Sequence, residues 1–503
     1  MMGAETAGRS FREGQKTAPA AHLDIKEVGR VKAVREFIIS VAGLLSCING
    51  QVVEFQRGGL GIVMGFTGDE TQVLLLGAGI SVRIGDEVYN KAWPLLLPVS
   101  DSYLGRIVSS LCDPLDGLGE LQPGDLYPVF RDAPGVMQRV PVHDTLETGT
   151  LLIDAVIPIA RGQRQLLIGD RLTGKTSVAL DAIISQKGKG VVCVYICIGK
   201  PYASLVKVLN LLREQDVLDY TVVVNAASSV SVGEQYLAPY VGTMIGEHFM
   251  LQGKNVLVIF DDLTKHAWIY RQISLLLERA PGREAYPGDI FYIHSQLVER
   301  AGSMGPELNN GSMTMLPIIE TLQGDLTGYI PTNMISMTDG QIFFDSGLFQ
   351  KGVKPPVDFG LSVSRIGNKA QWPGMRGLSK NFRLEYIQYQ ELLQMTRIRA
   401  SGISKQAQAR LRRGEAQTHL IVQDKNAPVS IPEQFIFLHA MNLGILDGLP
   451  AESMTKFKKE IFRFISSNQP DVIREIRTTR DISEKGKKAL EGSLRAYVQG
   501  LSG

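Results

Sequence analysis

Gly169-Asp170-Arg171-Leu172-Thr173-Gly174-Lys175-Thr176, continued by Ser177, is the segment that most strongly indicates the fold class. It matches the G-x4-G-K-T phosphate-loop pattern and lies between the strand-like run QLLI (165–168) and the helical run TSVALDAIISQ (176–186). Glycines let backbone N–H groups approach phosphate oxygens, and the helix that follows presents the positive end of its dipole. Lys175 can reach the β- and γ-phosphates, and the Thr176 hydroxyl can ligate Mg²⁺. The flanking strand and helix disfavour the alternative of a chance glycine turn before a helix.

The residues around this loop predict a parallel sheet. From about residue 100 to residue 372, apolar strand-like runs alternate with helical patterns, which is typical of a parallel sheet with helices on its faces. One such run (256–260) ends in Asp261-Asp262. Asp261 comes first off the strand end and suits the acidic residue that orients a magnesium water shell. The alternative is that both aspartates cap the next helix, and the phosphate loop favours the ligand interpretation for Asp261.

The two flanks of the chain show different patterns. Residues 26–99 contain short β-rich runs punctuated by Gly and Asp at intervals of about ten residues, which indicates a small antiparallel barrel or sandwich. Residues 373–503 carry apolar residues three and four apart, with Pro450 placed to open a helix. The first 25 residues lack the apolar segment of a signal peptide, and we expect a mobile tail there.

Composition narrows the classes of function. The chain has 503 residues with 44% hydrophobic and 21% charged residues, which excludes a disordered or collagen-like protein. Its 53 Lys and Arg nearly balance its 51 Asp and Glu, so no global basic field supports a nucleic-acid partner. Four cysteines show no metal-binding spacing, and no apolar run approaches the ~18 residues of a membrane span. We expect a soluble protein that holds an anionic ligand in a local site.

Longer segments carry a family resemblance. The phosphate loop, QYLAPYVGTMIGEHF (235–249), DDLTKHAWIYRQ (261–272) and PPVDFGLSVS (355–364) together resemble the α subunit of F-type ATP synthases over roughly residues 25–445. PPVDFGLSVS fits the pattern shared by α and β subunits, and DDLTKHAWIYRQ points to α. The resemblance implies a small β-barrel at 26–99, a RecA-like P-loop α/β nucleotide-binding domain at 100–372 and a C-terminal helical bundle at 373–503.

The resemblance also implies partners and a division of labour. In the family, three α and three β subunits alternate in a ring around the γ subunit, with a peripheral stalk and a membrane Fo sector. Catalysis belongs to β, while α binds Mg-ATP or Mg-ADP without turning it over and sends one arginine, here Arg365, into the neighbouring pocket. A planar, always-charged guanidinium suits a transferring phosphoryl group. Without the resemblance, a surface arginine in a Gly/Ser loop is the favoured interpretation. The implied location is the cytoplasmic face of a bacterial inner membrane.

Several residues match the family and others depart from it. Phe349 and Gln423 match its adenine-side residues. Ring ATPases of this type place a water-activating glutamate after the strand at 191–199, where this chain has Lys200 and most α chains have Gln. A lysine offers no carboxylate to a water, which predicts a non-catalytic site. Other departures are Leu172 for Gln, Lys354 for Arg, Lys425 for Gln, and an N-terminal segment (1–21) without the amphipathic helix that docks on the stalk.

Two other functions compete with this one. A self-sufficient hexameric P-loop motor, of the termination-helicase or secretion-ATPase type, shares the small β domain before a P-loop core. Lys200 and the lack of a basic, aromatic-rich face argue against it. A purely structural nucleotide-binding partner, without a role for Arg365 in catalysis, is the third hypothesis. The coupling ion is not fixed by this chain.

Overall fold

The computed structural model describes residues 27–77, 79, 81–398 and 404–502. The predicted N-terminal tail and the predicted missing stalk helix lie outside the described residues. The chain divides into two compact units: one holds nearly all of the first six strands, and the other comprises residues 76–79 and the chain from Pro94 onward. The predicted fold class is confirmed: a β-barrel, a central α/β region and a C-terminal helical region follow one another in the sequence. The boundaries at residues 26, 100 and 373 stay predictions.

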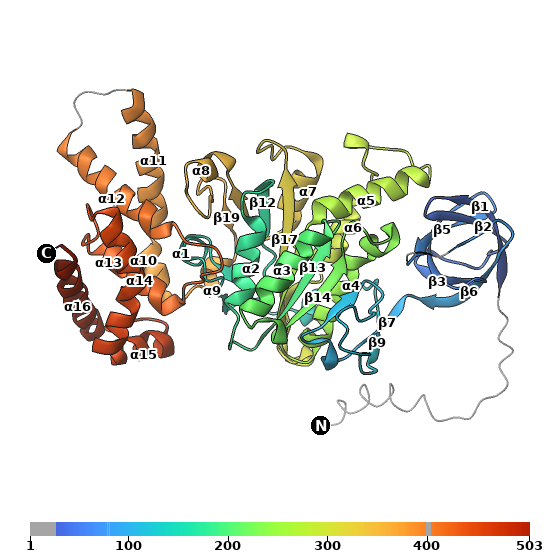
Figure 1. Cartoon of the computed structure of the whole chain (residues 1–503), viewed down its shortest axis with the longest axis horizontal. Helices are drawn as coiled ribbons and strands as arrows, with labels where there is room; N and C mark the ends of the chain where they lie inside the picture. Colours follow the sequence, from blue (N-terminus) through green and yellow to red (C-terminus); the bar gives the residue numbers. More distant parts are fainter. Residues whose placement is uncertain (1–26, 78, 80, 399–403, 503) are drawn as a thin grey trace. The chain divides into compact units, whose positions relative to one another are not determined.

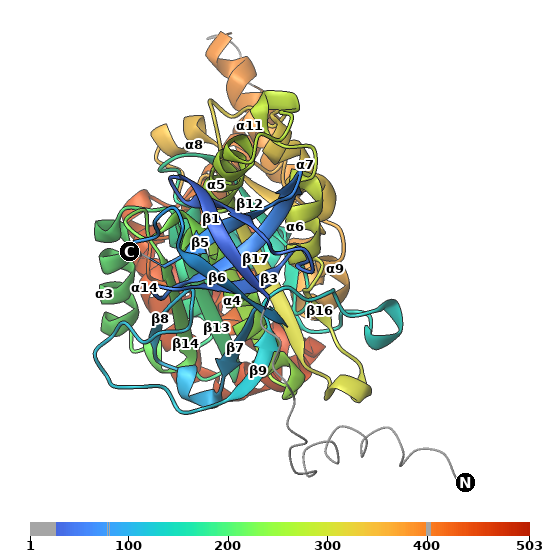
Figure 2. The ribbon, with the colours of Figure 1, turned by 90° about the vertical axis from the view of Figure 1, so that its right-hand side faces the viewer.

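The first unit is a closed barrel, which decides between the barrel and the sandwich. Its strands follow the order β1-β2-β5-β4-β3-β6, and Figure 2 shows them in dark blue. Closure leaves no strand edge open to another chain. Inward-facing valines and isoleucines such as Val31, Ile39 and Val73 form its core. The strand bounds are β1 Val28–Arg35, β2 Ile38–Ala42, β3 Gln51–Phe55, β4 Leu60–Thr67, β5 Glu70–Leu76 and β6 Glu87–Pro94.

The second unit is built on a largely parallel sheet, visible in cyan to yellow in Figure 1. The strand order is β19-β18-β12-β17-β15-β13-β14-β8, in which β19 alone of this path runs antiparallel to its neighbour. Strands such as β13 are apolar throughout because helices cover both faces. The bounds are β8 Ile107–Ser109, β12 Leu166–Asp170, β13 Val191–Ile198, β14 Thr221–Ala226, β15 Asn255–Asp261, β17 Ser312–Thr321, β18 Gly340–Phe344 and β19 Val363–Ser364; β16 (Gly302–Ser303) pairs with β17.

The helices pack on the two faces according to the two-residue period of the strands. Cys193, Tyr195 and Cys197 of β13 share one core cluster with the apolar residues of α2 (Lys175–Ile184) and α3 (Tyr202–Glu214). The alternate residue Ile196 faces α4 (Val232–Leu251), where a Cβ on Gly242 would lie 2.2 Å from its Cδ1. A glycine at this position therefore lets α4 pack closely on β13 and β15.

Helices fill the chain beyond the sheet, as the apolar spacing predicted. Pro450 is the N-cap of α14, and its spaced apolar residues Phe457, Ile461 and Ile465 are buried. Among the described residues, no helix has the length and apolar character that crossing a bilayer requires. The remaining bounds are α5 Leu263–Leu276, α6 Ile290–Val298, α7 Tyr329–Met337, α8 Ser346–Gln350, α9 Gly367–Ala370, α10 Pro373–Ser379, α11 Phe382–Ile398, α12 Lys405–Ile421, α13 Ile431–Asn442, α14 Ala451–Asn468, α15 Pro470–Thr479 and α16 Glu484–Ser502; β7 (Leu96–Val99), β9 (Asp125–Pro128), β10 (Thr145–Leu146), β11 (Ile159–Ala160) and α1 (Leu151–Val156) are short.

Candidate functional site

The phosphate loop lies at the carboxyl edge of the sheet, between β12 and α2. Its strand is flanked by β17 and β18, and ligands of open parallel sheets bind outside the carboxyl ends of such strands. Gly174 is the N-cap of α2 at φ +97°, a left-handed conformation that favours glycine. A Cβ on Gly169 would lie 2.3 Å from the carbonyl oxygen of Phe344, so glycine is also needed where β12 meets β18. The local sequence therefore fixes the loop shape that the motif predicts.

Lys175 lies folded over its own loop. Its ammonium donates hydrogen bonds to the carbonyl oxygens of Gly169, at 2.8 Å, and Asp170, at 2.5 Å. The residue is 5% exposed, and burial lowers the pKa of Lys175 to about 8, partly offset by nearby carboxylates. An arriving phosphate can take over these two hydrogen bonds and supply the opposite charge that the buried ammonium lacks.

Two of the other loop residues make hydrogen bonds that hold the loop in place, and two are exposed to solvent. Asp170 Oδ1 accepts hydrogen bonds from the Thr321 hydroxyl and the Gly324 amide, both at 2.7 Å, so its carboxylate braces the loop against the segment after β17. The Thr173 hydroxyl donates to the Asp170 carbonyl at 2.7 Å. Arg171 and Leu172 are exposed, and together with Ser177 they line the cavities on either side of the loop.

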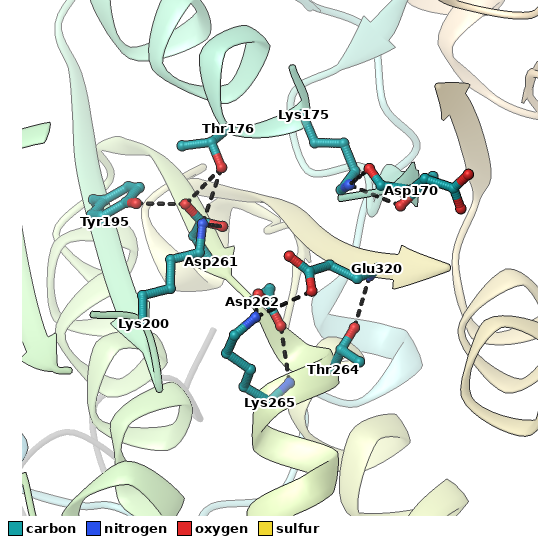
Figure 3. A network of polar contacts seen from close by, with 11 residues as sticks. Asp170, Lys175, Thr176, Tyr195, Lys200, Asp261, Asp262, Thr264, Lys265 and Glu320 are labelled. Atoms are coloured by element: carbon teal, nitrogen blue, oxygen red, sulfur yellow. Dashed lines mark hydrogen bonds and ion pairs between the residues drawn. The ribbon is translucent and has the colours of Figure 1, made fainter. Parts of the chain in front are cut away.

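Four side chains converge where the sequence predicted a metal site. Asp261, at the end of β15, has 0% side-chain exposure. Its Oδ2 accepts hydrogen bonds from the Thr176 hydroxyl at 3.0 Å and the Tyr195 hydroxyl at 2.6 Å. Its Oδ1 forms an ion pair with the ammonium of Lys200, which also donates to Thr176 Oγ1 at 3.1 Å. Figure 3 shows Lys200, Thr176 and Tyr195 gathered around the Asp261 carboxylate.

This arrangement does not fit a directly bound Mg²⁺. Thr176 and Asp261 supply the oxygen donors that the ion prefers, and that prediction stays untested. Mg²⁺ binds oxygen at about 2.1 Å, so an ion on Thr176 Oγ1 would lie within about 5 Å of the Lys200 ammonium. Two like charges at that distance in a largely enclosed site repel each other strongly. As the side chains lie, the ammonium fills the position between the two expected ligands.

Asp262 has the helix-capping role that the sequence left open for both aspartates. Its Oδ1 accepts from the backbone N–H of Lys265 at 2.9 Å, which caps α5, while its Oδ2 accepts from the Lys265 ammonium at 2.6 Å. The same ammonium lies 3.3 Å from Glu320 Oε2. Burial raises the pKa of Asp262. Burial alone would lower the pKa of Lys265, but the carboxylates of Asp262 and Glu320 outweigh this effect and raise it. Glu320 is thus held by a cation and does not stand free in the pocket (Figure 3).

Two cavities meet at the phosphate loop. One of about 310 Å³ contains Lys175, Thr176, Lys200 and Asp261. The other, of about 590 Å³, is lined by Phe349 and Gln423, which the sequence placed on the adenine side, by the two departures Lys354 and Lys425, and by Thr150, Asp181, Pro355 and Pro356. Leu172, Gly174 and Ser177 line both cavities. An elongated ligand with a polyanionic end and a planar end therefore fits across the loop.

Gln423 and Lys354 are already engaged within the chain. The Gln423 amide donates to the carbonyl oxygens of Gly149, at 2.7 Å, and Ala427, at 2.8 Å. The Lys354 ammonium lies 5.6 Å from the centre of the Phe349 ring, a cation–π contact between two residues that line the larger cavity. Gln423 shapes the larger cavity by holding its loop to the segment before α1.

Comparisons with known proteins agree with this geometry. Residues 149–364 match the family model of the ATP synthase alpha/beta family, nucleotide-binding domain, and residues 371–497 match the ATP synthase alpha/beta chain, C terminal domain. The chain belongs to this family. A protein of Petrotoga mobilis (strain DSM 10674 / SJ95), ATP synthase subunit alpha, is 43% identical over 479 residues, covering 94% of this chain and 95% of that protein.

Arg365 lies at the opposite edge of the sheet from the phosphate loop. It follows β19, whose Ser364 pairs with Gly340, the first residue of β18, while the loop begins where β12 ends. At about 3.3 Å per residue, the length of β12 alone separates the two edges by roughly 13 Å. The side chain is exposed, and its guanidinium has no hydrogen bond or ion pair with another described residue. Arg365 is therefore separated from the phosphate loop of its own chain by the length of the sheet.

Sequence reasoning missed several residues of the site. Tyr195 could have been found, because the two-residue period of β13 places it on the same face as α2, beside Asp261 of the next strand. Lys265 stands three residues after the capping aspartate, a spacing that allows an ion pair. Glu320 was hidden, because only the parallel register of β17 with β12 places it opposite Gly169.

Proposed function

We propose that this chain is the non-catalytic, nucleotide-binding α subunit of the F1 sector of a rotary ATP synthase, which makes ATP from ADP and phosphate using an ion gradient. The observation that carries the proposal is the identity of the residue that stands just beyond the end of β13. A cation, Lys200, stands there in the pocket of a complete phosphate loop, and the nearest carboxylates, Asp261, Asp262 and Glu320, are each engaged by a lysine. Without a free carboxylate to orient water, bound nucleotide is held and not hydrolysed.

The ligand is ATP or ADP, with its phosphates on residues 169–177 and its base in the larger cavity beside Phe349 and Gln423. Lys175 supplies the phosphate charge, and Ser177 and the exposed Leu172 border both halves of the nucleotide. The negative charge of a triphosphate stabilises the buried ammonium of Lys175, whose pKa burial lowers. Family membership and the two cavities, which share Leu172, Gly174 and Ser177, support this assignment.

The partners follow from the same assignment. The chain alternates with β subunits in an α3β3 ring around the γ subunit, and Arg365 enters the neighbouring β catalytic pocket. There the guanidinium stabilises charge on the phosphoryl oxygens during transfer. The ring stands on the cytoplasmic face of the membrane through the other subunits of the complex, including the peripheral stalk. Of the three predicted domains, 26–99, 100–372 and 373–503, the central one carries both the phosphate loop and Arg365.

Binding and turnover by the purified full chain test this function. ATP should raise the melting temperature, because a ligand of the native state stabilises it by mass action. Phosphate release should stay at the level of buffer. Lys175→Ala should remove the thermal shift while leaving the unliganded melting temperature nearly unchanged. Steady turnover that Lys175→Ala abolishes would show a catalytic site and favour a self-sufficient motor.

A further inference from the structure

We infer that the ammonium of Lys200 takes the place of Mg²⁺ in this site, so that the chain binds the phosphates of ATP or ADP without a divalent cation. The inference rests on the proposed nucleotide-binding function and adds to it the ionic form of the ligand. It rests on the position of Lys200, on its contacts and on the number of hydrogen bonds that an ammonium can donate.

The backbone holds Lys200 firmly at the mouth of the pocket. The Gly199 amide donates to the carbonyl of Ala226 at 2.8 Å, and the Lys200 carbonyl accepts from the Ser228 amide at 2.8 Å. Pro201 follows and is the N-cap of α3. Backbone hydrogen bonds on both sides and the following proline fix the main chain from which the side chain extends. The contacts of the ammonium with Thr176 and Asp261 then hold it in the pocket, and the side chain is only 17% exposed.

The contacts of the ammonium are those of a metal ion. It lies against Thr176 Oγ1 and Asp261 Oδ1, the two oxygen atoms that would ligate Mg²⁺ directly or through water. The Lys200 side chain is 17% exposed and Asp261 is fully buried, so solvent screens the pair weakly. Tyr195 satisfies the other carboxylate oxygen at 2.6 Å. The expected metal ligands are thus neutralised and hydrogen-bonded before a ligand arrives.

The ammonium keeps capacity for phosphate in this position. An ammonium donates three hydrogen bonds, and Thr176 and Asp261 account for two directions, which leaves one toward the cavity that also holds Lys175. Lysine is an established phosphate binder as a point charge. One cation can therefore join the loop hydroxyl, the strand-end carboxylate and a phosphate oxygen, which is the bridging role of the metal.

The test measures the dependence of ATP affinity on divalent cation, using the full chain and isothermal titration calorimetry. ATP is titrated in buffer with EDTA and in buffer with millimolar MgCl₂. We expect the wild-type Kd values in the two buffers to agree within about threefold, because the repulsion between the ammonium and Mg²⁺ removes the advantage of the metal. Lys200→Gln, which restores oxygen donors, should bind at least about tenfold more tightly with MgCl₂ than with EDTA.

Two controls make the outcome specific. Lys207→Gln removes a lysine from the exposed surface of α3 and should behave as the wild type. Lys200→Met removes the charge at similar length and should weaken binding in EDTA. A wild-type chain that binds at least tenfold more tightly with MgCl₂ would overturn the inference and leave the nucleotide site standing. A Lys200→Gln chain as indifferent to MgCl₂ as the wild type would also overturn it. Failure to bind ATP in both buffers would refute the proposed function itself.

Discussion

Replacing Arg365 by lysine in the assembled ring separates a catalytic contribution from a structural one. The guanidinium has no polar partner among the described residues of its own chain, and the backbone N–H bond to the Asp339 carbonyl, at 2.9 Å, survives any substitution. The free energy of unfolding of the isolated chain should therefore change by less than about 0.5 kcal/mol. Turnover should fall by at least about a hundredfold, or roughly 2.7 kcal/mol of barrier, since losing such a finger costs about 10³ to 10⁵ and lysine keeps only the charge.

The assay is ATP hydrolysis by α3β3 complexes reconstituted with each variant, with assembly checked by size-exclusion chromatography. KM should change far less than kcat, because charge spreads over the phosphoryl oxygens only as the bond breaks. Arg213→Lys, on the exposed end of α3, is the matched control and should keep full turnover. Turnover within about twofold of the wild type, which is under 1 kcal/mol, would refute the finger assignment. Poor assembly of the variant would instead make Arg365 a structural contact.

Three further predictions follow from burial and packing. Burial lowers the pKa of Lys175 to about 8, and bound phosphate holds the proton, so ATP affinity should fall by up to about tenfold between pH 7 and pH 9; a Kd that calorimetry finds constant over this range would contradict the shift. Gly242→Ala should destabilise the chain by about 1–3 kcal/mol through overpacking, whereas Gly492→Ala, with open space around its Cβ in α16, should stabilise it by about 0.5–1 kcal/mol; equal urea midpoints would refute the packing argument. Glu247→Gln leaves the guanidinium of Arg300, 1% exposed and bound at 2.6 and 2.7 Å, without its charge partner, and should cost about 3–5 kcal/mol in thermal unfolding; a loss under 1 kcal/mol would show that the charge is solvated.

The fold was largely predictable because its signals are local. Apolar period and glycine spacing fix the strand before the phosphate loop, the helix after it and the C-terminal helices, and each of these depends on neighbours within a few residues. The choice between barrel and sandwich was not predictable from the residues alone. It depends on the pairing of β1 with β6, whose residues stand far apart in the sequence.

The candidate site was predictable by position and less so by contact. The sequence showed that Lys200 stands where a catalytic glutamate is expected. Its approach to Thr176 and Asp261 could not be predicted, because it depends on the parallel register of β13 with β15, which pairs Cys197 with Asp261. Equally, adjacent aspartates look alike in a sequence. Only the alternation at the strand end directs Asp261 to the loop and Asp262 to the cap of α5.

The separation of Arg365 from the phosphate loop has a consequence for symmetry. In a twofold pair the same surface patch of each chain meets itself. A chain with an arginine at one edge of its sheet and a nucleotide pocket at the other cannot bring both to a neighbour in such a pair. Contacts of this polarity are head-to-tail, and they continue from chain to chain until the rotation closes into a ring or the assembly grows as a filament. Under the proposed function, the direction in which neighbours follow one another is set by the antiparallel pairing of β19 with β18, which brings Arg365 to the edge opposite the phosphate loop.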